Sequence, residues 1–107
     1  MNAFDPSVTL KLSIQRALLG EVSERLASLT CGLNGQHIRI RAYFSPRVTE
    51  QDIEQISGVA AQVIADFPGG FTIEETCSTV GDGEPQMLDF WAFERKPSDM
   101  GQQPDVR

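Results

Sequence analysis

The pattern of apolar residues predicts that the chain opens with a helix at about residues 10–19. Apolar side chains recur there at intervals of three and four, which puts them on one helix face: Ile14, Ala17, Leu18 and Val22. Apolar and polar residues also alternate between Val8 and Ile14, as they do in a half-buried strand. The pattern therefore favours a helix in the second half of this segment and leaves its first half open between helix and strand.

A second helix is predicted after Pro46. Thr49 is a favourable N-cap, and the acidic residues that follow it suit the positive end of a helix. Apolar positions then keep helical spacing over about four turns, giving one continuous face made of Ile53, Ile56, Ala60, Val63, Ile64 and Phe67. The Pro-Gly-Gly sequence at residues 68–70 ends this helix.

Alternating apolar and polar residues predict four strands, at residues 27–33, 38–44, 71–79 and 87–95. The first two flank Asn34-Gly35, the preferred pair for a two-residue type I′ hairpin turn, and the last two flank a glycine-rich loop. The order αββαββ predicts a two-layer α+β fold: a four-stranded antiparallel sheet with both helices on one face. We expect residues 1–96 to form one domain and residues 97–107 to be a disordered polar tail.

A single layer of helices would leave the other sheet face open to solvent. The alternation assigns to that face His37, Arg39, Arg41, Tyr43, Thr72, Glu74, Thr76, Ser78, Met87, Asp89, Trp91 and Phe93. The last strand is apolar on both sides, so its outer side is covered either by the rest of the chain or by a partner. Trp and Tyr are enriched at interface hot spots, which makes Trp91 and Tyr43 candidate anchors.

Charge changes this picture more than composition does. The 107 residues carry a net charge of −6, which argues against a nucleic-acid binder because such proteins cluster Lys and Arg. Residues 11–47 sum to +4, whereas residues 48–94 contain ten acidic residues and no Lys or Arg, and so sum to −10. This segment is either ordinary solvated charge or an acidic docking surface for a basic protein.

Residues that carry chemistry do not form a catalytic or metal-binding pattern. His37 is the only histidine, and Cys31 and Cys77 lack the close spacing of zinc ligands. We therefore expect no enzymatic activity, no cofactor and no metal site. The start of the chain has no signal-peptide pattern and no apolar run long enough to span a membrane, so we expect a cytoplasmic protein with reduced thiols. The spacing leaves a Cys31–Cys77 bridge open.

Two short stretches carry a resemblance to a known family. They are Gln15-Arg16-Ala17-Leu18-Leu19-Gly20 and Val63-Ile64-Ala65-Asp66-Phe67, and the similarity covers about residues 12–95. The chain resembles small bacterial proteins associated with polymorphic-toxin and contact-dependent growth inhibition loci, whose members are thought to act as immunity proteins. The resemblance implies an acidic, non-catalytic protein that binds a toxin domain, often a basic nuclease.

Together these observations predict a non-catalytic acidic binding protein that neutralises a cognate bacterial toxin domain. The alternative is a homo-oligomeric structural or assembly protein, with a second copy as its partner. The predicted partner-binding residues are the carboxylates of the acidic segment and the two aromatic anchors: Glu50, Asp52, Glu54, Glu74, Asp82, Glu84, Asp89, Trp91 and Tyr43. Opposite charges on the two partners would speed their association.

Overall fold

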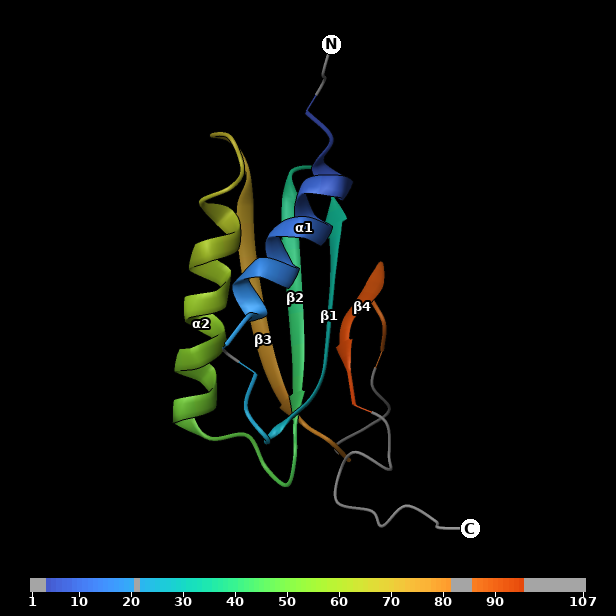
Figure 1. Cartoon of the computed structure of the whole chain (residues 1–107). Helices are drawn as coiled ribbons and strands as arrows, with labels where there is room; N and C mark the ends of the chain where they lie inside the picture. The colour runs from blue at the N-terminus through green and yellow to red at the C-terminus, as the bar shows by residue number, and fades with distance from the viewer. Residues whose placement is uncertain (1–3, 21, 82–85, 96–107) are drawn as a thin grey trace, which may run out of the picture.

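The computed structural model describes residues 4–20, 22–81 and 86–95 (Figure 1). Its elements, in chain order, are α1 (Pro6–Leu18), β1 (Leu26–Asn34), β2 (His37–Phe44), α2 (Glu50–Ile64), β3 (Thr72–Thr79) and β4 (Phe90–Glu94). The predicted order αββαββ is confirmed. The tail at residues 97–107 lies outside the described residues, as do Asp82 and Glu84.

The first helix, α1, begins four residues before the predicted start, so the strand interpretation of residues 8–14 is wrong. Asp5 caps it: Asp5 Oδ1 accepts hydrogen bonds from the N–H groups of Ser7 and Val8. Buried residues, Leu10 and Ile14 among them, lie at helical spacing on one side, whereas Val8 and Leu12, the other two apolar residues of the strand-like pattern, point outward. Val8 is 51% exposed and Leu12 is 65% exposed.

The hairpin between β1 and β2 is confirmed, with its turn shifted by one residue. Asn34 pairs with His37, so Gly35 and Gln36 are the two turn residues rather than Asn34 and Gly35. Gly35 has a φ of 65°, and no non-glycine residue in the described chain has a positive φ. A positive φ at only the first turn position fits a type II′ turn rather than the predicted type I′ turn.

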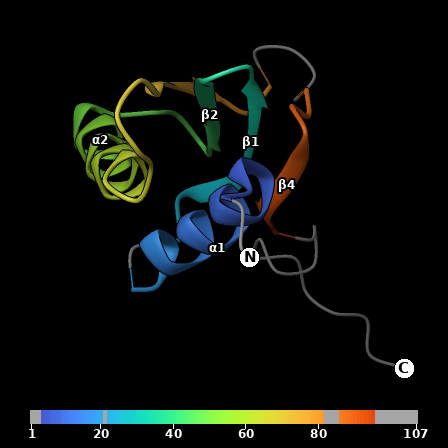
Figure 2. The ribbon, with the colours of Figure 1, turned by 90° about the horizontal axis from the view of Figure 1, so that it is seen from above.

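The prediction of a wholly antiparallel sheet is wrong. The strand order is β3-β2-β1-β4, and β3 runs parallel to β2 through eight consecutive residue pairs. Two strands joined by a helix can return in parallel, and here α2 makes that crossover between β2 and β3. The predicted second hairpin does not exist, because β3 and β4 lie at opposite edges of the sheet. Figure 2 shows both helices on the same side of this curved sheet.

The core forms between the helices and the sheet. β2 contributes alternate residues, Ile38, Ile40, Ala42 and Phe44, and α2 contributes Ile56, Val59, Ala60 and Val63. The two stretches that carried the resemblance meet here: Ala17 and Phe67 belong to the same core, and the Arg16 guanidinium pairs with the Asp66 carboxylate. Ser13, which is buried, also donates to Asp66 Oδ2 at 2.6 Å. These motifs therefore join α1 to the end of α2.

Candidate partner-binding surface

One exposed stripe of α2 lies on the side nearest β3. The buried residues of α2 define its inner face, and at about 100° per residue Glu50, Glu54 and Ser57 share a stripe on the outer side. The Ser57 hydroxyl donates to Glu75 Oε2 at 3.2 Å, so this stripe borders β3. The arrangement places Glu50 and Glu54 on an outer stripe that lies between the Glu75 carboxylate and the hollow lined by Ser23, Arg25 and Asp52, which Glu54 also borders.

We call Glu50, Glu54, Glu74 and Glu75 the acidic flank. Adjacent strand residues point to opposite sides of a sheet, so Glu75 faces the helix side and Glu74 the other side of the same strand. Glu74 Oε1 lies 3.0 Å from Nε2 of His37. Within the described part of the chain, neither Glu50 nor Glu54 forms an ion pair, so both are available to a partner.

Asp52, predicted as a partner-binding residue, is only 4% exposed. Its Oδ2 accepts hydrogen bonds from the N–H and the hydroxyl of Thr49, both at 2.9 Å, while its own N–H donates to Thr49 Oγ1 at 3.2 Å. This reciprocal arrangement is a capping box that satisfies free N–H groups at the start of α2. The Asp52 carboxylate is therefore engaged within the protein.

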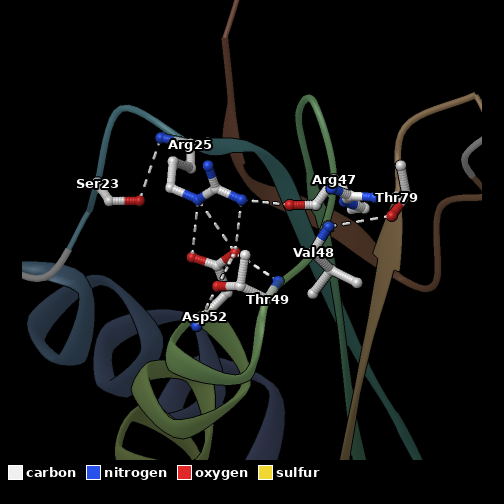
Figure 3. Close-up of polar contacts among 7 residues, drawn as sticks. All are labelled: Ser23, Arg25, Arg47, Val48, Thr49, Asp52 and Thr79. Atoms are coloured by element: carbon white, nitrogen blue, oxygen red, sulfur yellow. Dashed lines mark hydrogen bonds and ion pairs between the residues drawn. The ribbon is translucent and has the colours of Figure 1, made fainter.

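Arg25 connects this cap to two neighbouring segments (Figure 3). Its Nε donates to both carboxylate oxygens of Asp52, at 3.2 and 3.1 Å, and its Nη2 donates to the carbonyl of Arg47. Burial alone would raise the pKa of Asp52. The hydrogen bonds from Thr49 and the positive charge of Arg25 outweigh burial, so the pKa lies below its usual value. The cluster holds the acidic stripe of α2 in place.

The predicted anchors Tyr43 and Trp91 lie on the sheet face opposite the helices. Their ring centroids are 6.3 Å apart, but Tyr43 is only 7% exposed. Its hydroxyl accepts a hydrogen bond from the N–H of Gln86, and the N–H of Leu88 donates to Thr30 Oγ1. The segment before β4 therefore covers part of the face that was predicted to be open.

Phe93 was predicted on that same face, and this prediction is wrong. A register irregularity between Leu29 and Thr30 pairs Trp91 with Thr30 but pairs Phe93 with Leu29. Leu29 is a core residue, and Phe93 packs against the core beside it. The strict alternation of the sequence pattern fails at this irregularity, because such an irregularity shifts the side to which the following residues point.

Asp89 lies before β4 rather than within the predicted strand. Its Oδ2 accepts a hydrogen bond from the N–H of Leu33 at 2.9 Å. A Cβ atom at Gly32 would lie 2.8 Å from the Asp89 side chain, so a glycine is needed for this close approach. Asp89 is exposed, but its carboxylate ties this loop to β1.

The acidic second half of the sequence does not form one surface. β3 and β4 lie at opposite edges, with the first hairpin between them. In register, Arg39 lies beside Glu74, and Arg41 lies between Thr76 and Thr30. The described carboxylates predicted to form one docking surface are therefore divided between the α2–β3 flank, the capping box and the loop before β4.

The two thiols lie on different strands, and the pKa of each is raised. Cys31 and Cys77 lie on β1 and β3 with β2 between them, which is about 10 Å at normal strand spacing and too far for a disulfide. Burial raises the pKa of Cys31 to about 12 and that of Cys77 to about 11. Among the described residues, no cluster of His, Cys, Asp and Glu could hold a metal ion. None of the helices in that part of the chain could span a membrane.

The comparison with protein families defines the class of this protein as an immunity protein. The family model described as MafI2 immunity protein matches residues 7–97, so the chain belongs to the MafI2 immunity protein family. This match confirms the resemblance to immunity proteins of toxin loci. Such families are typically non-catalytic and imply a toxin as partner. No curated protein matches the chain.

Sequence reasoning missed Glu75 and Arg25. Glu75 shares one side of a predicted strand with Ile73 and Cys77, so the sequence pattern put a carboxylate on the apolar side. That position is tolerable only where the strand borders solvent, so Glu75 was a signal for an edge strand. The role of Arg25 had no signal in the sequence, because its partner Asp52 is 27 residues away.

Proposed function

We propose that this protein binds and neutralises a cognate toxin domain through its acidic flank, and that the contacted toxin surface is basic. The strongest support is the position of Glu50 and Glu54, which are exposed and form no ion pair within the described residues, next to β3 with its Glu74 and Glu75. No Lys or Arg interrupts the sequence from residue 48 to residue 94. Opposite potentials raise association rates and reject wrong partners, which suits an inhibitor that must act quickly.

The proposal assigns different roles to the residues predicted as binding residues. Glu50, Glu54 and Glu74 contact the toxin, together with Glu75. Asp52 acts through the cap that orients α2. Asp89, Trp91 and Tyr43 lie away from the acidic flank, and a toxin contact there stays a prediction from the sequence.

Isothermal titration calorimetry tests the proposal, with the cognate toxin domain as the ligand. We expect the double variant E50K/E54K to weaken binding at least about 30-fold at 50 mM salt, since it replaces two attractions with two repulsions. The affinity of the unmodified protein should fall as salt rises, because salt screens exposed charges. Glu94→Lys is the control: Glu94 is exposed on β4, at the opposite sheet edge. A toxin affinity that changes neither with salt concentration nor in the E50K/E54K variant contradicts the proposal.

A second candidate function is self-assembly, which is favoured by an exposed apolar stripe on α1. Val8, Leu12 and the cap residue Leu19 share one side of the helix, opposite its buried face, and Leu19 is 75% exposed. Such a stripe on two copies can pack together. Light scattering distinguishes this candidate: a concentration-dependent dimer that L12E abolishes supports it, and a monomer at millimolar concentration contradicts it.

A further inference from the structure

Among the described residues, β3 has a strand neighbour on one side alone: it forms an edge of the sheet and pairs only with β2. Thr72 N–H donates to the Gln36 carbonyl and Val80 N–H donates to the Phe44 carbonyl, so the even-numbered residues of β3 face β2. In a parallel ladder, the backbone N–H and C=O groups of every second residue bond to the neighbouring strand, and those of the residues in between point away from it. The N–H and C=O groups of four odd-numbered residues therefore point away from β2, toward the open edge of the sheet: Ile73, Glu75, Cys77 and Thr79.

This edge has the features that favour addition of another strand. Its eight residues pair with β2 without any bulge, and it contains no Pro and no Lys. Edge strands usually prevent pairing with bulges, prolines, lysines or a charge on the core-facing side, and of these devices β3 carries the last, at Glu75. An extended segment about 4.8 Å away could hydrogen-bond to the outward groups along the whole strand.

α2 provides a second contact for such a segment. Ile53 lies one turn before Ser57, on the side of α2 that borders β3, and it is 47% exposed. Side chains from the helix-facing side of an added strand would approach Ile53 and cover it. Glu50 and Glu54 lie along the same stripe, so the added segment would also meet two carboxylates.

Charge determines which segment fits. Two copies of β3 paired across a two-fold axis would bring Glu74 and Glu75 close to the same residues of the other copy. Like charges on neighbouring strands oppose pairing. A segment with Lys or Arg at alternate positions would instead meet the acidic flank with opposite charge.

We propose that the outer edge of β3 accepts an extended, Lys- or Arg-bearing segment of the toxin as a fifth strand of the sheet. This inference rests on the proposed function and specifies its contact: main-chain hydrogen bonds from Ile73, Glu75, Cys77 and Thr79 bind the segment, and the acidic flank selects its charge. An added strand uses the backbone, whereas simple charge docking uses only side chains.

Amide hydrogen exchange of this protein, followed by NMR with and without the cognate toxin domain, tests the inference. Without toxin, the amides of Glu74, Thr76 and Ser78 should already be protected, because they bond to β2. In the complex, the outward amides of Ile73, Glu75, Cys77 and Thr79 should exchange at least about tenfold more slowly. A complex in which these amides exchange as before overturns the inference alone. Failure to form any complex contradicts the proposed function as well.

A pair of variants at Glu75 separates the backbone from the charge. Glu75→Pro removes an outward N–H without removing a bond to β2, and Glu75→Gln removes the charge but keeps that N–H. We expect E75P to weaken toxin binding at least about tenfold more than E75Q, with a melting curve showing that E75P is folded. Equal affinities of folded E75P and E75Q overturn the inference. If E75P does not fold, the inference is tested by the hydrogen exchange of the four outward amides in the complex.

Discussion

Replacing Asp52 with alanine removes two structural contacts at once. The carboxylate forms the capping box with Thr49 at the start of α2, and it also accepts the paired hydrogen bonds of Arg25. Both contacts hold the helix that carries Glu50 and Glu54. Because Asp52 is buried, its loss should reduce stability directly and toxin binding only through the fold.

The size of the effect follows from the two contacts. Asp52→Ala keeps Thr49 as the N-cap but removes the Asp52 half of the capping box, the two hydrogen bonds that its carboxylate accepts from Thr49, which costs about 1 kcal/mol. Charge-assisted hydrogen bonds are worth more, but the Arg25 side chain is 36% exposed and can be rehydrated, so this part contributes about 1–2 kcal/mol. The sum is about 2–3 kcal/mol, which corresponds to a fall of about 10–20 °C in melting temperature for a domain of this size.

Urea unfolding of the original protein, Asp52→Ala and Thr49→Ala measures both parts. Thr49→Ala keeps the Arg25 contact and should cost only about 1 kcal/mol. Because the folded-state pKa of Asp52 is lowered, its contribution is complete above the unfolded pKa of about 3.9. The free energy of unfolding of the original protein should therefore exceed that of Asp52→Ala by a constant amount from pH 5 to 8. This difference should shrink as the pH falls through the folded pKa of Asp52. Equal stability of Asp52→Ala and Thr49→Ala at pH 7 would refute the role assigned to Arg25.

Two further substitutions test the packing. Gly32→Ala should cost about 1–3 kcal/mol in urea unfolding, because the new Cβ would lie 2.8 Å from Asp89; a neutral effect would show that this loop shifts easily. Ser13→Ala should cost about 1–2 kcal/mol, because Ser13 is buried and bonded to Asp66, whereas Arg16→Ala should cost under about 1 kcal/mol because the Arg16 side chain is 63% exposed. The reverse order would contradict this account of the α1–α2 contact.

Local patterns in the sequence were sufficient for most elements. Thr49 and the acidic residues after it marked the start of α2 correctly, because capping depends on residues that are close in the chain. Asn34 and Gly35 marked the hairpin for the same reason, although the turn is one residue later. The start of α1 was missed because exposed Val8 and Leu12 imitated a strand.

Long-range pairing could not be obtained from these patterns. Alternation predicts that β3 is a strand, but it does not say which strand is its neighbour. The assumption that consecutive strands form hairpins gave an antiparallel partner in β4, whereas the α2 crossover placed β3 parallel to β2. This error joined the carboxylates of β3 to the loop before β4, so the candidate site was predicted as one surface instead of a flank along α2 and β3.

Protection of growing cells tests the central claim most directly. Bacteria that express the cognate toxin domain would also express this protein, E50K/E54K or the control E94K, each at an equal, verified level of folded protein. The account predicts that the original protein and E94K preserve colony formation, whereas E50K/E54K lets it fall by at least about tenfold. Full protection by E50K/E54K would contradict the claim that the acidic flank neutralises the toxin.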